Sequence, residues 1–243
     1  MNAMILAAGL GKRLRPLTDT LPKPLVEMGE RPLLEQTLLQ LAALGVGRVV
    51  INVHHLAERI LERIGDGRAF GLEVLWSREA QLMDTGGGVR MALPLLGDAP
   101  FLAVNGDVAW HMELKPLVDA FDPAVMDGLL GLVPVPEGVG GGDFVLEGGS
   151  GRLRRAGGDK RGLVYSGIQM LRPGALTDYP LIPFSLNRFY DDAIGADRLR
   201  GIPLTGFWAD IGTLERLTAA RQAWKNRFAF GDGLAYKDSG FND

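Results

Sequence analysis

The sequence contains no cysteine among its 243 residues. This absence excludes disulfides, thiol catalysis and cysteine-based zinc sites. The sequence also has little excess of one charge over the other, with a net charge of -3 and a pI of about 5.7. This balance favours neither nucleic acid nor a membrane surface as a partner. No basic segment followed by a long apolar stretch opens the chain, and no apolar run reaches the length of a transmembrane helix. We therefore expect a soluble cytoplasmic protein that acts on small molecules, as a monomer or homodimer.

The hydrophobic content of 47% is enough for one sizeable core. Segments typical of strands and helices alternate along the first half of the chain, which predicts an α/β fold. The central sheet should be mostly parallel, with helices on both faces. We expect one domain over residues 1–227, with a small antiparallel insertion at about 134–162, followed by a C-terminal tail over 228–243. The predicted strands are 4–8, 48–53, 72–76, 101–107 with its exit, 127–133, 163–171 and 201–204. The predicted helices are 31–44, 56–64, 84–93, 113–121 and 214–226, and residues 184–196 are predicted to be helical or irregular.

The first glycine-rich motif follows a short apolar run near the start of the chain. Residues 4–8 are apolar on both faces, as a buried parallel strand requires. Gly9 and Gly11 then let the backbone turn sharply and approach a ligand without an intervening Cβ atom. Exposed backbone N–H groups in such a turn form a nest that suits phosphate oxygens. This motif is neither a Walker loop nor a dinucleotide fingerprint, because a single residue separates the glycines and Leu14 stands where the third dinucleotide glycine is required.

Basic residues follow this turn. Arg13 can bind phosphate through its forked guanidinium, and Lys12 or Lys23 can add a point charge. Pro22 and Pro24 stiffen the backbone around Lys23, which lowers the entropy cost of holding its ammonium group in place. The combination favours a phosphate-binding loop over a turn whose basic residues are merely solvated.

Two later segments also have residues suited to a ligand. Residues 84–88 read Asp-Thr-Gly-Gly-Gly, and either Asp84 or Thr85 can cap the helix that follows while the glycines admit a ligand. Asp107 lies just past an apolar strand, at the sheet edge where open α/β folds bind ligands. A carboxylate there suits Mg²⁺, which prefers hard oxygen ligands, although an ordinary Gly-Asp turn is the alternative. His54 and His55 are adjacent and point to opposite faces of a strand, so we interpret them as structural residues rather than metal ligands.

The segment from Leu6 to Thr18, together with Pro22-Lys23-Pro24-Leu25, closely resembles the signature of the sugar-1-phosphate nucleotidylyltransferases. Asn-Gly-Asp at 105–107 and Trp-Ala-Asp-Ile-Gly-Thr at 208–213 are also similar to motifs of this family. The resemblance implies a Rossmann-like α/β fold, a nucleoside triphosphate and a sugar 1-phosphate as substrates, and Mg²⁺ as cofactor. It implies that Asp107 and Asp210 hold the metal, and that Arg13 and Lys23 act with them in catalysis. The implied nucleotide contacts are Ala8, Gly9, Gly11, Lys12, Arg13, Lys23, Thr85, Gly86 and Gly87.

The insertion at about 134–162 should border the sugar pocket, with Asp143 at its edge if the insertion folds over the site. Many members of the family have a Glu-Lys-Pro run in this region whose lysine binds the sugar phosphate. This chain lacks that run, because Gly148 and Gly149 follow Glu147, and either Lys160 or Arg161 is a candidate substitute. The predicted sugar contacts are Asn105, Gly106, Asp143, Ser166 and Gly167.

The hypothesis is Mg²⁺-assisted, in-line transfer of a nucleotidyl group to a sugar 1-phosphate with release of pyrophosphate, by positioning and charge stabilisation. The segments Asp-Thr-Gly-Gly-Gly and Val-Asn-Gly-Asp and the short insertion resemble the small N-acetylmuramate-1-phosphate uridylyltransferases of cell-wall recycling, which use UTP. A mannose- or glucose-1-phosphate nucleotidylyltransferase is the alternative enzyme. A non-catalytic nucleotide-sugar sensor is the alternative of another class.

Overall fold

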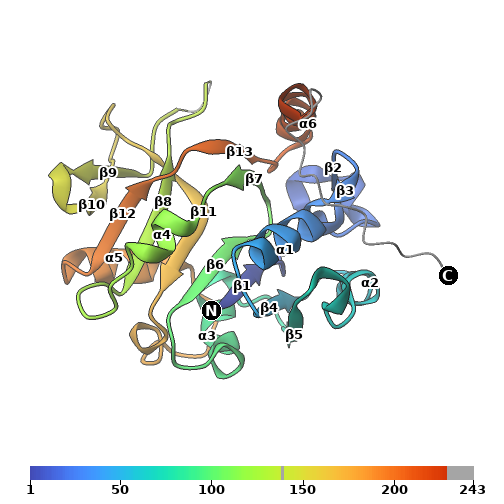
Figure 1. The fold of residues 1–243 in the computed structure, drawn as a ribbon, viewed down its shortest axis with the longest axis horizontal. Coiled ribbons are helices and arrows are strands. Elements are labelled where there is room, and N and C mark those ends of the chain that lie inside the picture. The colour runs from blue at the N-terminus through green and yellow to red at the C-terminus, as the bar shows by residue number, and fades with distance from the viewer. Residues whose placement is uncertain (138–139, 229–243) are drawn as a thin grey trace.

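The computed structural model describes residues 1–137 and 140–228 (Figure 1). The predicted tail lies outside the described residues except for Phe228. Within the described part of the chain, nine strands form one twisted sheet in the order β5-β4-β1-β6-β11-β8-β12-β10-β9. Strands β5, β4, β1 and β6 are mutually parallel, β11 runs antiparallel to both β6 and β8, and β12 is parallel to β8. The bounds are β1 Asn2–Leu6, β4 Arg48–Val53, β5 Glu73–Arg78, β6 Phe101–Asn105, β8 Gly128–Val133, β11 Val164–Leu171 and β12 Leu199–Pro203.

Helices cover both faces of this sheet, which confirms the predicted α/β architecture (Figure 1). Alternate residues of β1 show why both faces are apolar, since Ala3 and Ile5 belong to one buried core and Met4 belongs to the other. Apolar residues at helical spacing provide the buried side of the longer helices, for example Leu34, Leu38 and Leu41 in one helix and Leu186, Phe189 and Ala193 in another. The first core is covered by α1 Leu33–Ala43, α2 Ala57–Ile64 and α4 Lys115–Asp119, and the second by α3 Asp84–Leu96 and α5 Leu186–Gly195.

The insertion contains the predicted antiparallel hairpin, formed by β9 Phe144–Glu147 and β10 Arg152–Arg155. It is not separate from the main sheet, because Arg152 of β10 pairs with Arg200 of β12 and the hairpin extends the sheet edge. The two longest strands that were not predicted are β7 Val108–Met112 and β13 Gly206–Asp210, which form an antiparallel ladder of their own.

A third apolar cluster lies beneath the last described helix, α6 Leu214–Phe228. Leu217 and Ala220 of α6 pack there against Leu14, which comes from the first glycine-rich motif. The short strands β2 Glu27–Met28 and β3 Arg31–Pro32 pair beside this helix. No helix in residues 1–137 and 140–228 is long and apolar enough to cross a bilayer.

Asp127 joins three strands at the end of the sheet opposite the functional edge described below. Its carboxylate accepts hydrogen bonds from Arg172 Nε and Nη2 at 2.8 and 2.5 Å, and lies 2.8 Å from Arg198 Nε. Its backbone N–H donates to the carbonyl oxygen of Arg198 at 2.8 Å. The side chain is 14% exposed, so water screens these ion pairs less than it screens surface pairs.

We expect Asp127→Asn to lower the free energy of unfolding by about 1–3 kcal/mol, because two partly buried arginines lose a charged acceptor. Urea denaturation followed by circular dichroism measures the change. Asp119→Asn is the matched control, since Asp119 pairs with Lys115 on an exposed helix surface and should cost less than about 0.5 kcal/mol. Equal effects of the two substitutions would contradict the structural role given to Asp127.

Candidate active site

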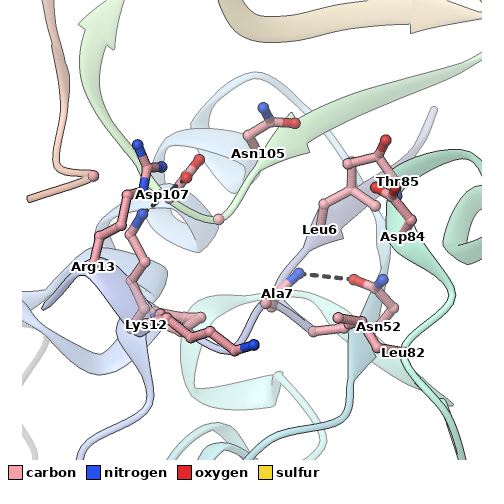
Figure 2. A pocket seen from close by; sticks show the side chains of 17 residues that line it. Leu6, Ala7, Lys12, Arg13, Asn52, Leu82, Asp84, Thr85, Asn105 and Asp107 are labelled. Atoms are coloured by element: carbon pink, nitrogen blue, oxygen red, sulfur yellow. Dashed lines mark hydrogen bonds and ion pairs between the residues drawn. The ribbon is translucent and has the colours of Figure 1, made fainter. Parts of the chain in front are cut away.

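A cavity of about 420 Å³ opens at the carboxyl ends of β1, β4 and β6 (Figure 2). In Figure 2, Arg13 and Asp107 lie on one side of the cavity, Asn52, Leu82, Asp84 and Thr85 lie on the other, and Ala7 is between them. The wall therefore combines cationic side chains with backbone from the glycine-rich loop, as expected for an anion site. The lining residues are Leu6, Ala7, Ala8, Gly9, Gly11, Lys12, Arg13, Lys23, Pro24, Asn52, Leu82, Asp84, Thr85, Asn105, Gly106, Asp107 and Gly212.

The two glycines of the first motif have different surroundings, because a Cβ atom on Gly11 would lie 2.8 Å from Thr18 Cγ2 whereas the space beside Gly9 is open. Gly11 has a φ of +62°, and Thr18 Oγ1 donates a hydrogen bond to its carbonyl oxygen at 2.8 Å. A Cβ atom on Gly9 would meet no protein atom within 4 Å, so space beside the loop remains available to a ligand. Gly106 has a different role, because its N–H donates to Leu6 O at 2.9 Å and an added Cβ would lie 2.6 Å from that oxygen.

Asn52 is a functional residue that the sequence reasoning missed. It is buried at the end of β4, where its Oδ1 accepts the N–H of Ala7 at 2.7 Å. Its Nδ2 donates to Glu79 Oε1 at 2.7 Å, and Glu79 Oε2 accepts the N–H of Met83 at 2.9 Å. The amide thus links the glycine-rich loop to the segment that leads into α3. The available signal was a polar residue inside the otherwise apolar strand Val-Val-Ile-Asn-Val.

Lys23 and Asp107 form an ion pair at one side of the cavity, with 2.9 Å between Lys23 Nζ and Asp107 Oδ2. Lys23 is buried, and the flanking Pro22 and Pro24 fix the short 3-10 turn that carries it. The lysine is thereby held with its ammonium at the cavity rather than in bulk solvent.

Asp210 approaches the same region through β7 and β13. It pairs in register with Val108, the residue after Asp107, so the two aspartates occupy neighbouring positions although they are far apart in the sequence. A Cβ on Gly212 would lie 2.8 Å from Asp210 Oδ1 and 3.1 Å from Arg13 Nη2, which places Arg13 beside Asp210. Asp210 itself does not line the cavity, and its Oδ2 is paired with Arg216.

These residues are compatible with Mg²⁺ held jointly with a substrate. No group of three or more histidine, aspartate or glutamate side chains in the described part of the chain could hold a metal by itself. Mg²⁺, however, usually takes only one or two protein carboxylates and completes its shell with water and phosphate oxygens. Asp107 and Asp210 supply two hard carboxylate donors, with side chains that are 39% and 30% exposed.

Gly86 and Gly87, which were predicted to contact the nucleotide, are packed against another part of the protein. Their N–H groups both donate to Phe184 O, at 2.8 and 3.1 Å, and neither residue lines the cavity. A Cβ on Gly87 would lie 2.5 Å from Ile182 O, so the missing side chain permits close packing of α3 on residues 182–184. Asp84 and Thr85, which precede them, do line the cavity. Neither caps α3, because the helix begins after Met83 without a side-chain cap and Thr85 Oγ1 accepts the N–H of Leu186.

A second cavity of about 240 Å³ adjoins the first and shares Asp84, Thr85 and Asn105 with it. Asp143, one of the predicted sugar contacts, lines this cavity, and its Oδ2 accepts the N–H of Tyr165 at 2.8 Å. Burial raises the pKa of Tyr190 to about 12 and holds the pKa of Tyr165 well above its usual range, so both phenols are neutral at physiological pH. The lining residues are Asp84, Thr85, Asn105, Asp143, Phe144, Arg155, Tyr165, Ser185, Leu186, Asn187 and Tyr190.

Ser166 and Gly167 are not placed as predicted. Ser166 is fully buried, and its Oγ accepts the N–H of Ile168 at 3.2 Å, so this hydroxyl is not presented to either cavity. Gly167 has a φ of +80°, and a Cβ there would lie 3.0 Å from Asn105 Cβ. Its role is to let Asn105 pack closely, which positions a side chain that lines both cavities.

Neither candidate for the missing lysine lines a cavity. Arg161 is exposed and pairs with Asp159, and Lys160 is also exposed. The basic residue in the second cavity is instead Arg155, at the end of β10. The two histidines have separate partners, since His54 Nδ1 contacts Glu79 O and His55 Nε2 contacts Thr18 O. This agrees with the structural interpretation.

Comparison with known proteins defines the class. The profile of the nucleotidyl transferase family matches residues 2–139. In fold, the chain is similar to UDP-glucose pyrophosphorylase solved in complex with UDP-glucose, with a TM-score of 0.76, 16% identity and coverage of 93% of this chain and 98% of that one. The chain belongs to the nucleotidyl transferase family and is an enzyme of that class.

Other relatives are more similar to this chain in sequence than that pyrophosphorylase is. The chain is 38% identical over 233 residues to N-acetylmuramate alpha-1-phosphate uridylyltransferase of Neisseria meningitidis, with coverage of 93% of this chain and 100% of the relative. It is 35% identical over 229 residues to the enzyme with the same description from Caulobacter vibrioides, with coverage of 90% and 94%. These similarities confirm the family predicted from the sequence motifs.

We expect Gly87→Ala to destabilise the protein by about 1–3 kcal/mol, because the new methyl group meets a backbone oxygen that cannot rotate away. The sign of the change in unfolding free energy distinguishes this clash from the ordinary effect, because replacing glycine by alanine within a helix usually stabilises a protein by up to about 1 kcal/mol. Gly195→Ala in α5 is the control, because a Cβ there meets nothing within 4 Å. Thermal unfolding of the two variants measures the difference, and stabilisation by Gly87→Ala would refute the packing role.

Proposed function

We propose that this protein transfers the uridylyl group of UTP to N-acetylmuramate 1-phosphate, producing the UDP-sugar and pyrophosphate, with Mg²⁺ as cofactor in cell-wall recycling. The observation that carries the proposal is the pair of joined cavities. One is lined by the glycine-rich loop and three cations, and the other by polar and aromatic side chains suited to a sugar. The relatives from N. meningitidis and C. vibrioides support the choice of base and sugar.

The reaction requires little from the protein except positioning and charge. A phosphate oxygen of the sugar 1-phosphate attacks the α-phosphorus of UTP, the bond to the bridging oxygen of the β-phosphate breaks, and pyrophosphate leaves with that electron pair. The loop at Gly9 and Gly11 holds the triphosphate with its backbone. Arg13 neutralises the departing pyrophosphate through its fork of donors. Lys23, held at the cavity edge, aligns the attacking phosphate with the α-phosphate and offsets their mutual repulsion.

Asp107 and Asp210 are the residues that would hold Mg²⁺. When bound, the metal supplies Lewis-acid neutralisation of the phosphate oxygens. In the structure, both carboxylates are paired with cations of the protein, Asp107 with Lys23 and Asp210 with Arg216. A triphosphate in the cavity offers Lys23, which lines it, a second anionic partner, which frees an oxygen of Asp107 for the metal.

The first test is pyrophosphate release with Mg²⁺ across UTP, dTTP, CTP, GTP and ATP, each combined with N-acetylmuramate, N-acetylglucosamine, glucose and mannose 1-phosphates. We expect the highest kcat/KM for UTP with N-acetylmuramate 1-phosphate. A maximum with GTP and mannose 1-phosphate would retain the chemistry and replace the substrate assignment. No release with any pair from a folded protein that binds a UDP-sugar would favour a sensor.

We expect Lys23→Met and Asp107→Asn each to lower kcat by about 100- to 1,000-fold, because each removes a preorganised charge from the transition state. Asp107→Asn should also raise the Mg²⁺ concentration needed for half-maximal activity. Lys160→Met and Asp19→Asn are matched controls, since these residues are exposed and line neither cavity. Near-wild-type turnover of both site variants, with circular dichroism showing intact folds, would rule out these roles.

A further inference from the structure

Arg155 is the one cationic side chain that lines the second cavity in the described part of the chain. The first cavity, in contrast, is lined by Lys12, Arg13 and Lys23. The first cavity therefore has a cluster of three cations, as suits phosphates, whereas the second cavity has a single guanidinium. Asp84 and Asp143 also line the second cavity, so a ligand with a second negative charge would meet repulsion there unless a cation received it.

The guanidinium of Arg155 is held in a fixed orientation. Its Nε donates to Asp191 Oδ1 at 2.7 Å, and its Nη2 donates to the carbonyl oxygen of Asn187 at 3.1 Å. Its Cζ lies 4.7 Å from the centre of the Phe144 ring, which supports the guanidinium by a cation–π contact. Arginine has five N–H donors, and these two bonds leave the Nη1 donors for a ligand.

The proposed substrate supplies the matching group. N-acetylmuramate differs from N-acetylglucosamine by a lactyl ether, which carries a carboxylate in addition to the 1-phosphate. A guanidinium presents its donors in a plane that matches the two oxygens of a carboxylate. Glucose, mannose and N-acetylglucosamine 1-phosphates have no such group, so a fixed arginine in the sugar cavity offers them no comparable bond.

We propose that Arg155 binds the lactyl carboxylate of N-acetylmuramate 1-phosphate and selects this substrate over N-acetylglucosamine 1-phosphate. The inference rests on the proposed function, because it assigns the residue that reads the sugar in that reaction. Asp191 and Asn187 hold Arg155 in place from α5, and Phe144 holds it from β9. Selection thus depends on the junction of the edge hairpin with this helix, whereas phosphate binding depends on the glycine-rich loop.

The test compares kcat/KM for the two sugar phosphates, with UTP saturating, in the wild-type enzyme and in Arg155→Met. We expect a loss of about 10- to 100-fold for N-acetylmuramate 1-phosphate, as for a lost charge-assisted hydrogen bond. The loss should be mainly in KM, because the carboxylate is remote from the reacting phosphorus. Turnover of N-acetylglucosamine 1-phosphate should change by less than about twofold. Arg155→Lys should recover part of the preference, and Arg161→Met, an exposed arginine that lines neither cavity, should leave it unchanged.

A second measurement does not depend on the variant folding. The methyl ester of the lactyl carboxylate adds only a methyl group but lacks the negative charge, and the wild-type enzyme should use it as poorly as Arg155→Met uses the acid. Combining the ester with Arg155→Met should give no further loss, since both changes remove one interaction. Equal use of acid and ester by the wild-type enzyme, or equal losses for both sugars in Arg155→Met, would overturn the assignment. Failure of the wild-type enzyme to use N-acetylmuramate 1-phosphate would instead overturn the proposed function.

Discussion

The side chain of Asn52 is the interaction on which the geometry of the site depends. One amide accepts the N–H of Ala7 and donates to Glu79, and it therefore joins the ends of three neighbouring strands of the sheet. The hydrogen-bonded pair of Asn52 and Glu79 also restricts which residue can occupy position 88 in α3. A Cβ on Gly88 would lie 2.7 Å from Asn52 Nδ2 and 2.8 Å from Glu79 Oε1, so α3 can pass this pair only with glycine at that position. A buried amide with both ends satisfied stabilises one arrangement of the loop, because any other arrangement leaves a polar group unpaired.

Two ion pairs join cations and carboxylates at the site before any substrate arrives. Lys23 faces Asp107, and Arg216 faces Asp210. Lys23 is buried, whereas the Asp107 side chain is 39% exposed and the Asp210 side chain is 30% exposed. The ammonium group of Lys23 is therefore already in place beside the cavity, and such preorganised charge is what charge-based catalysis requires.

Local patterns determined much of the fold. The apolar run over 48–53 and the helix ending at Gly65 were predicted within a residue, because strand and helix periodicity and the terminating glycine are local properties. The ladder of β7 and β13 was not predicted, since it joins segments about a hundred residues apart and lies outside the main sheet. Glycines in the site were harder to interpret. The lack of a side chain can serve a ligand at Gly9 or a packed backbone at Gly87, and only the fold distinguishes the two. Arg155 was missed for a related reason, because an arginine in a charged run such as Arg-Leu-Arg-Arg has no sequence signal for its direction.

The position of the β9–β10 hairpin at the outer edge of the nine-stranded sheet has a consequence for how such enzymes diversify. Edge hairpins can be lengthened, shortened or replaced while the central strands keep their partners. This hairpin joins the rest of the protein backbone where Arg152 pairs with Arg200 and where Phe144 bridges to Leu163. The glycine-rich loop follows β1, in another part of the sheet, and β1 is paired on both sides. Under the proposed function, substrate choice and reaction chemistry thus belong to separate parts of the chain, and exchanging the hairpin between relatives is a direct route to enzymes that attach the same nucleotide to different sugars.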